Sequence, residues 1–250
     1  MLFGFNLNDL FLFPIQTGEA RKHFLIGCLI YLAGFFIPIL PWLVVSGYSA
    51  LLIRQVLNGE KLHLVPWENW EALLKDGARM FGIRLVYSSP MLILMMPIFF
   101  LFFAGPFIAI FLENSEGSGG GFIYLISMFV GMAAFLIMMP LSLVIGLIVP
   151  AAEIHTISKD DFMAGFQVRE WWPIFKKNWG GFLVALAIMY GIMMVMSMVM
   201  QVAFMTLVFI CLLPIFLPVV SMYMGVVQYA AFAQAYKDGR DRLQLPAPVA

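Results

Sequence analysis

The sequence has few charged residues for its length. Only 11% of its 250 residues are Asp, Glu, Lys or Arg, whereas 63% are hydrophobic. A soluble domain has about 25% charged residues, so this chain has too few to cover a water-exposed surface. Its 14 basic and 14 acidic residues balance, which gives no electrostatic reason to expect nucleic acid as a partner. We therefore expect an integral membrane protein that does not bind nucleic acid.

Cysteine is also scarce. The two cysteines, Cys28 and Cys211, both lie within apolar runs. Such a pair does not indicate a disulfide framework, which small secreted domains build from several cysteines. We expect both side chains to be small buried hydrophobes, with no redox or metal role.

Motifs for catalysis or cofactor binding are absent. The segment from Glu153 to Asp161 holds the nearest approach to a site, because Glu153 and His155 precede Asp160 and Asp161. Residues two apart on a helix do not share a face, and no second histidine or HExxH pattern stands nearby. The sequence also lacks a nucleotide-binding fingerprint. We expect no catalytic residue, no metal and no cofactor, so the chain is not expected to be an enzyme.

What the sequence does contain is four long apolar stretches, at residues 24–53, 85–112, 122–152 and 181–236. One membrane span needs about 20 residues, so the second and third stretches each fit one helix and the fourth fits two. The turn within the fourth stretch is expected at Leu213–Pro218, because proline cannot continue a helix hydrogen-bond ladder.

The first stretch contains two prolines near its middle, Pro38 and Pro41. Basic residues flank both of its ends, with Arg21 before it and Arg54 after it. Because basic residues favour the cytoplasmic face, an even number of crossings is preferred. We expect a short helical hairpin at 24–57, either spanning or re-entrant. The alternative is a single kinked span, which would place the N-terminus outside and give five spans.

The distribution of basic residues sets the topology. None of the 14 lies in the loop at 113–121, so that loop is expected outside and both chain ends in the cytoplasm. The predicted order is an N-terminal interfacial segment at 1–23, the hairpin at 24–57, a cytoplasmic amphipathic segment at 58–84, a span at 85–112, the external loop at 113–121, a span at 122–152, a second cytoplasmic amphipathic segment at 153–180, two spans at 181–236 and a cytoplasmic tail at 237–250.

The segments 1–23, 58–84 and 153–180 place apolar residues at helical spacing on one face. Five of the six tryptophans lie in the last two, and tryptophan prefers the headgroup level of a bilayer. These helices either anchor the cytoplasmic face or sense the membrane surface and dock partners. The predicted fold is an all-α, polytopic transmembrane helical bundle of about six membrane helices, including short proline-broken hairpins, with interfacial amphipathic helices.

Prolines occupy matching places near the two ends of the chain. Each proline pair precedes an apolar helix that closes in glycine, Gly59 in one case and Gly239 in the other. Both glycines suit a C-terminal helix cap, and broken helices in corresponding positions can mark a transporter site. The candidate hinges are Pro38, Pro41, Pro214 and Pro218.

Ionisable residues are absent from the middle of every predicted span, although coupled transporters usually carry them there. Of the neutral polar groups within spans, Gln201 is the most informative, because an amide in hydrocarbon needs a hydrogen-bond partner. The candidate partners are a neighbouring helix or a substrate.

Three segments resemble a known family. FLFPIQTGEARKHFLIG, IPILPWLVVSGYSALLIRQVLNGE and VPWENWEALLKDGARMFGIRL are similar to the opening of a prokaryotic multi-span family catalogued as domain of unknown function 4013, and AFAQAYKDG resembles its closing helix. The family is usually Gly-Glu-rich near its third interfacial helix, whereas Gly165 stands here in FMAGFQVRE without that Glu. The resemblance implies a multi-pass protein of the prokaryotic cell (inner) membrane and implies no reaction or ligand.

Three functions are compatible with these observations. The first is a non-catalytic accessory or structural subunit, or a bilayer-organising protein, whose partners are membrane lipids and other membrane subunits. The second is a small-molecule transporter or channel with its site at the proline-broken helices. The third is a lipid-modifying enzyme, which would require Glu153, His155 and one of the following aspartates to converge.

Overall fold

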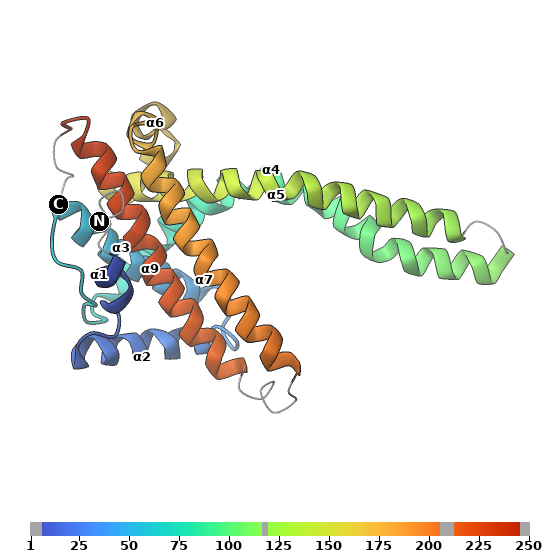
Figure 1. Ribbon diagram of the computed structural model, residues 1–250, viewed down its shortest axis with the longest axis horizontal. Coiled ribbons are helices and arrows are strands. Elements are labelled where there is room, and N and C mark those ends of the chain that lie inside the picture. Colours follow the sequence, from blue (N-terminus) through green and yellow to red (C-terminus); the bar gives the residue numbers. More distant parts are fainter. Residues whose placement is uncertain (1–6, 117–119, 206–212, 246–250) are drawn as a thin grey trace. The chain divides into compact units, whose positions relative to one another are not determined.

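The computed structural model describes residues 7–116, 120–205 and 213–245, and no strand occurs within these ranges. Among their helices, α3, α4, α5, α7 and α9 are long and apolar enough to cross a membrane, which confirms the expected all-α fold of membrane helices. The elements in chain order (Figure 1) are α1 (Leu7–Leu12), α2 (Gly18–Ala33), α3 (Leu40–Asn58), α4 (Trp70–Glu116), α5 (Gly120–Lys159), the 3-10 helix η1 (Phe162–Phe166), α6 (Val168–Lys177), α7 (Trp179–Met205) and α9 (Leu213–Asp241).

The chain divides into two compact units. The first, which we call the core bundle, contains the residues up to Ile83 and those from Val149 onward, and the second, the α4–α5 unit, is Arg84–Ile148. Helix α9 is the centre of the core bundle, because it packs against α1, α2, α3, α6 and α7. Small side chains allow backbones to approach closely, and α9 has four fully buried alanines: Ala230, Ala231, Ala233 and Ala235.

The α4–α5 unit is held by close contacts between its two helices. A Cβ atom added at Gly105 would lie 2.4 Å from Ser127 Cβ, and one at Gly131 would lie 2.0 Å from the ring of Phe102. Because these two positions have no side chain, Ser127 of α5 can pack against the backbone of α4 and Phe102 of α4 can pack against the backbone of α5. Most of the remaining apolar side chains of this unit are exposed.

The predicted hairpin at 24–57 corresponds to two helices. α2 begins at Gly18 rather than Phe24, because the Thr17 side chain accepts a hydrogen bond from the amide of Ala20 and caps the helix there. The chain then breaks before α3, next to Pro38, and Ile39 adopts a φ of 74°. Pro41 lies in the first turn of α3, where a missing N–H costs no intrahelical bond.

The two glycines expected to cap helices behave differently. Gly59 ends α3 with a φ of 80°, and its amide bonds back to the carbonyl of Val56, so this cap is confirmed. The prediction for Gly239 is wrong, because α9 continues to Asp241. A Cβ atom at Gly239 would lie 2.5 Å from the carbonyl oxygen of Ile174, so this glycine allows α6 to pack against α9.

The predicted turn at Leu213–Pro218 is also wrong, because α9 begins at Leu213. Pro214 lies in the first turn, which tolerates proline. Pro218 lies inside the helix, where it removes one backbone hydrogen bond and is buried. Residues 206–212, which precede α9 in the sequence, lie outside the described residues.

Helix boundaries differ from those predicted wherever an amphipathic segment adjoins a span. Residues 70–84 form the first part of α4, which continues without interruption through the predicted span at 85–112. In the same way, α5 extends the predicted span at 122–152 to Lys159. No glycine, proline or capping residue separates the amphipathic part of α4 from its apolar part at 84–86, so the helix does not end there.

The predicted external loop and cytoplasmic tail are both shorter than expected. α4 reaches Glu116 and α5 begins at Gly120, so most of the loop predicted at 113–121 is helical. α9 likewise takes up the first five residues of the tail predicted at 237–250. Helix propagation adds one hydrogen bond per residue, so polar residues at a helix end join the helix when nothing terminates it.

Helices α3 and α4 cross with their backbones in contact inside the core bundle. A Cβ atom at Gly47 would lie 1.8 Å from the carbonyl oxygen of Leu73, and one at Gly77 would lie 1.8 Å from that of Leu43. Gly47 of α3 and Gly77 of α4 thus both allow the two helices to approach closely at the same crossing point. This crossing fixes the N-terminal half of α3, and the other end of α3 leads to the site described next.

Candidate functional site

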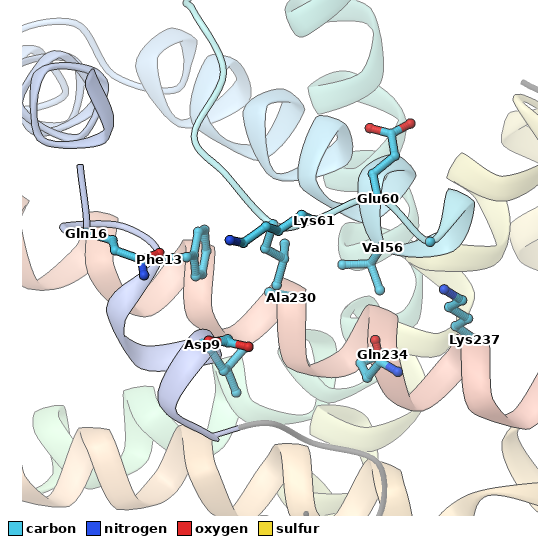
Figure 2. A pocket seen from close by; sticks show the side chains of 12 residues that line it. Asp9, Phe13, Gln16, Val56, Glu60, Lys61, Ala230, Gln234 and Lys237 are labelled. Atoms are coloured by element: carbon cyan, nitrogen blue, oxygen red, sulfur yellow. The ribbon is translucent and has the colours of Figure 1, made fainter. Parts of the chain in front are cut away.

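A pocket of about 270 Å³ lies between α1, the turn that follows α3, and α9 (Figure 2). Its apolar lining comes from all three elements and includes Leu10, Phe13, Val56 and Ala230. Charged and amide side chains complete the wall: Asp9, Gln16, Glu60, Lys61, Gln234 and Lys237. We call this cavity the α1–α9 pocket.

Two hydrogen bonds to backbone carbonyls hold the walls of the α1–α9 pocket together. The Tyr223 hydroxyl of α9 donates to the carbonyl of Phe11 at 3.1 Å, which fixes α1. The buried Arg240 Nη2 of α9 donates to the carbonyl of Leu57 at 3.1 Å, which fixes the end of α3. The positive charge of an arginine near a helix C-terminus also interacts favourably with the negative end of the helix dipole. α3 and α9 therefore run parallel, with their C-terminal ends together.

The turn after α3 brings charge to the pocket. Because Gly59 takes up a left-handed conformation, the chain reverses there and Glu60 and Lys61 follow directly. A Cβ atom at Gly59 would lie 3.0 Å from Lys237 Nζ, so that ammonium group lies against the turn. The Glu60 carboxylate accepts a 3.4 Å hydrogen bond from Asn58 Nδ2.

Neither lysine of the pocket forms an ion pair within the described part of the chain. Lys61 is exposed and Lys237 is half-buried. Together with Asp9 and Glu60, they give a pocket with two ammonium groups and two carboxylates. Of these four groups, the two ammonium groups are the ones without a hydrogen-bond or ion-pair partner in the described residues.

A second charged feature joins α3, α4 and the end of α5. The Asp76 carboxylate lies between the guanidinium groups of Arg54 and Arg79, and Asp160 bridges the same two arginines from the other side. Arg79 Nη1 lies 2.6 Å from Asp160 Oδ1 and 3.2 Å from Asp76 Oδ1. The Asp76 side chain is 6% exposed and that of Asp160 is 57% exposed. We call these four residues the ion-pair network.

The ion-pair network makes stability depend on pH. The hydrogen bond from Arg79 lowers the pKa of Asp160 below its usual range, and the charges of Arg79, Arg54 and Lys75 act in the same direction. A carboxyl group with a lowered folded-state pKa stabilises the fold above its unfolded pKa, and that contribution is lost as the pH falls through the folded value.

We expect Asp160→Asn to be less stable than the wild type at pH 7 and to approach it as the pH falls through the lowered pKa of Asp160, where the aspartate loses its charge. The difference should stay within about 1 kcal/mol because Asp160 is exposed. Thermal unfolding in detergent at a series of pH values measures it. A difference that does not shrink as the pH is lowered from 7 into the acid range, for as long as the protein stays folded, would contradict this assignment.

The residues of the proposed lipid-enzyme site are bonded to different partners. Glu153 is fully buried and accepts a 2.8 Å hydrogen bond from the Tyr229 hydroxyl. His155 Nδ1 lies 2.6 Å from the Tyr236 hydroxyl, whereas Asp160 belongs to the ion-pair network. Both tyrosines come from α9, so these contacts join α5 to the centre of the core bundle. Within the described ranges, no three His, Cys, Asp or Glu side chains are grouped so as to hold a metal ion.

The other ring nitrogen of His155 is also buried and lies toward α6. Its Nε2 lies 3.4 Å from a Glu170 carboxylate oxygen, without hydrogen-bond geometry, and Lys159 lies 3.6 Å from the same oxygen. His155 thus links the buried end of α5 to α6.

The residues singled out from the sequence do not line the α1–α9 pocket. Gln201 is exposed on α7. Of the four prolines, Pro38 and Pro214 are exposed, whereas Pro41 and Pro218 are buried within helices. Sequence reasoning missed Lys61 and Lys237 as residues of a common site. A partial signal was present, because each lysine lies two residues from one of the two glycines, Gly59 and Gly239, that were expected to cap helices.

A second cavity, of about 550 Å³, lies within the α4–α5 unit. It is lined by apolar side chains of both helices, among them Met95, Phe99, Met132 and Phe135. Methionine and aromatic side chains of this kind adapt to flexible apolar ligands. The cavity matches the chemistry of lipid acyl chains.

Comparison with known proteins gives one result for this chain. The model of a family described as "Protein of unknown function (DUF4013)" matches residues 30–205, well over half of the chain and all of the segment from the end of α2 to the end of α7. No curated protein and no solved structure matches. The chain belongs to the DUF4013 family of proteins of unknown function.

Proposed function

We propose that this chain is a non-catalytic protein of the prokaryotic cell membrane that acts by contacting lipids and other membrane subunits. The exposure of its membrane helices carries the proposal. In the most apolar 18-residue stretch of each helix, 67% is buried in α3, but only 11% in α4 and 17% in both α5 and α7. Apolar surfaces of this size are covered by lipid or by a partner.

The face of α7 around Gln201 favours a protein neighbour. Its exposed side chains are apolar and include Met194, Met198 and Val202. Within the described residues, the Gln201 amide has no hydrogen-bond partner. An amide in hydrocarbon gains about 0.6–2 kcal/mol from a hydrogen bond across helices. A polar group on a neighbouring subunit would satisfy it.

The arrangement of charges supports cytoplasmic chain ends. The C-terminal ends of α3 and α9 lie together. The charged groups lie at these ends or on the helices beside them, and they include Lys61, Lys237 and the ion-pair network. Basic residues remain on the cytoplasmic side. The proposed orientation therefore has both termini inside.

The transporter alternative has less support. It places the site at the proline-broken ends of α3 and α9, whereas the α1–α9 pocket lies at the opposite ends. Pro41 and Val56 are separated by about four turns of α3, which corresponds to roughly 22 Å. The enzyme alternative is not favoured by the separate partners of Glu153, His155 and Asp160.

Extraction into native lipid discs tests the proposal. We expect the wild type to retain a second membrane protein in a fixed ratio, and Gln201→Leu to reduce that ratio between about threefold and thirtyfold. Quantitative mass spectrometry of the purified discs gives the ratio. Ser197→Ala is the matched control, because Ser197 lies one turn earlier on α7 and its hydroxyl already bonds to the carbonyl of Met194 at 2.8 Å. The proposal fails if the wild type is solitary, or if both variants behave alike.

A further inference from the structure

We propose that the hairpin formed by α2 and α3 is re-entrant. It enters the bilayer from the cytoplasmic side, contacts the acyl chains of that leaflet with its tip, and returns to the same side. We call residues 35–42, which connect α2 to the first turn of α3, the hairpin tip. The proposal takes its orientation from the proposed function and needs no partner subunit.

The hairpin tip is an exposed apolar surface. All of its side chains except that of Pro41 are exposed, and Phe36 is 83% and Trp42 60% exposed. The tip contains no charged residue. A continuous apolar surface of this kind, with charged residues beside it, marks contact with a membrane or with another protein.

The order of side chains along α2 identifies the contact as lipid. Glu19, Arg21 and Lys22 are exposed in the first turns of α2, where the two basic groups can reach phosphate headgroups. Further along the helix, Leu25 and Leu29 are 59% and 64% exposed. Charge followed by apolar surface on one helix matches the headgroup and acyl layers of a single leaflet.

Both ends of the hairpin lie on one side of the core bundle. Gln16, two residues before α2, lines the α1–α9 pocket, and so does Gly59, directly after α3. That pocket lies at the C-terminal ends of α3 and α9, which is the proposed cytoplasmic side. The chain therefore returns to the side from which it entered, so α2 and α3 either both cross the membrane or both turn back within it.

The length of α2 decides between these two cases. The 16 residues of α2 span about 24 Å, which is less than the roughly 30 Å of a hydrocarbon core. From Lys22 to the end of the helix at Ala33 the distance is only about 16 Å. α2 is also not among the described helices that are long and apolar enough to cross a membrane. The helix therefore reaches about the middle of the bilayer.

The position of α3 beside α9 gives the same depth. α3 is long enough to cross by itself, but Leu57 at its end lies against Arg240 of α9, and the two helices run parallel. Leu40 and Tyr223 both lie 17 residues before that contact, so they are at about the same level. From Tyr223, α9 continues to Leu213, a further 15 Å or about half of the hydrocarbon core. The hairpin tip thus lies well short of the far end of α9.

Thiol labelling in membrane vesicles tests the sidedness, with both native cysteines replaced by alanine. Gly18→Cys and Glu60→Cys mark the two ends at exposed positions, and Phe36→Cys marks the tip. We expect a membrane-impermeant maleimide to label both ends in inverted vesicles only. From either face it should label the tip at about a tenth of that extent or less, because a thiol in hydrocarbon does not ionise. Labelling of the tip from the outer face, of the two ends from opposite faces, or of both ends from outside would overturn the proposal.

Fluorescence quenching measures the depth of the hairpin tip. The purified protein, labelled at Phe36→Cys, is reconstituted into vesicles of phosphatidylethanolamine and phosphatidylglycerol that carry a quencher on the headgroup or at the chain end. We expect several-fold stronger quenching from the chain end, as for Ile93→Cys, whose native side chain is 71% exposed on α4. Lys176→Cys, at an exposed position of α6, is the control for aqueous iodide. Ile37→Cys replaces the tip variant if Phe36→Cys does not fold.

Two results of the quenching experiment would contradict insertion of the hairpin tip. Iodide quenching as strong as that of Lys176→Cys would place the tip in water. Weak quenching by every probe would mean that a second copy of the chain covers it. Because these vesicles contain no other protein, either failure is distinguishable from the absence of a partner subunit.

Discussion

Substituting alanine at Gly47 is expected to lower the free energy of unfolding by about 3 kcal/mol, near the upper end of the usual cost of overpacking. The added Cβ atom would lie 1.8 Å from the carbonyl oxygen of Leu73. That oxygen belongs to the backbone of α4 and cannot rotate away, so the two helices must move apart. Thermal unfolding in mild detergent, followed by tryptophan fluorescence, measures the loss.

The control for this prediction is Gly191→Ala in α7. Nothing lies within 4 Å of a Cβ atom at that position, and replacing a helical glycine with alanine gains roughly 0.5–1 kcal/mol. Gly77→Ala should act like Gly47→Ala, and the double variant should lose less than the sum, because both serve the same crossing. If Gly47→Ala and Gly191→Ala unfold at the same temperature, the close crossing of α3 and α4 does not exist in solution.

The second large effect is expected at Asp76. Asp76→Ala removes the carboxylate that lies between Arg54 and Arg79, whose side chains are 33% and 16% exposed. Removing one partner of a buried ion pair costs about 3–5 kcal/mol, because the remaining charges are left uncompensated. We expect a value near 3 kcal/mol here, since Asp160 still contacts both arginines.

Chemical denaturation of the purified protein measures this difference. Asp76→Asn should be intermediate, because the amide oxygen still accepts hydrogen bonds while the charge is lost. Glu68→Ala is the control, since Glu68 is exposed and lies just before α4. A loss below about 0.5 kcal/mol for Asp76→Ala would show that the ion-pair network does not hold α3, α4 and α5 together.

The helical membrane fold could be predicted from the sequence, because long apolar runs leave few alternatives in a bilayer. The boundaries of α4, in contrast, could not be predicted from the sequence. Residues 70–84 are amphipathic and those after 84 are apolar all round, and this change was interpreted as the end of one element and the start of another. A helix continues where its surroundings change, unless a capping residue, a glycine or a proline terminates it at that point.

The prolines show a second limit of local patterns. Pro214 and Pro218 were expected to form a turn, yet both lie in α9. Membrane helices tolerate proline because neighbouring groups satisfy the backbone carbonyl that it frees. The matching pair Pro38 and Pro41 does mark a helix break. Two similar proline pairs, three and four residues apart, therefore have different outcomes, and packing decides between them.

The α1–α9 pocket could not be predicted, because its lysines are 176 residues apart in the sequence. They meet only because α3 and α9 pack in parallel, with Arg240 bonded to the carbonyl of Leu57. The weak repeat between the two helices hinted at their similarity but not at their contact. Gly47 and Gly77 were missed for a similar reason, since a glycine in a helix does not indicate what lies against it.

The position of α9 at the centre of the core bundle has a consequence for biosynthesis. α3 is complete at Asn58, but the helix that buries it ends at Asp241. At about 5–20 residues per second, a ribosome needs roughly 10–40 s to make the chain between those points. Throughout that interval the nascent α3 must stay shielded by the translocon, a chaperone or lipid. Chains that terminate early would expose this helix, and membrane quality-control proteases would have a ready signal for removing them.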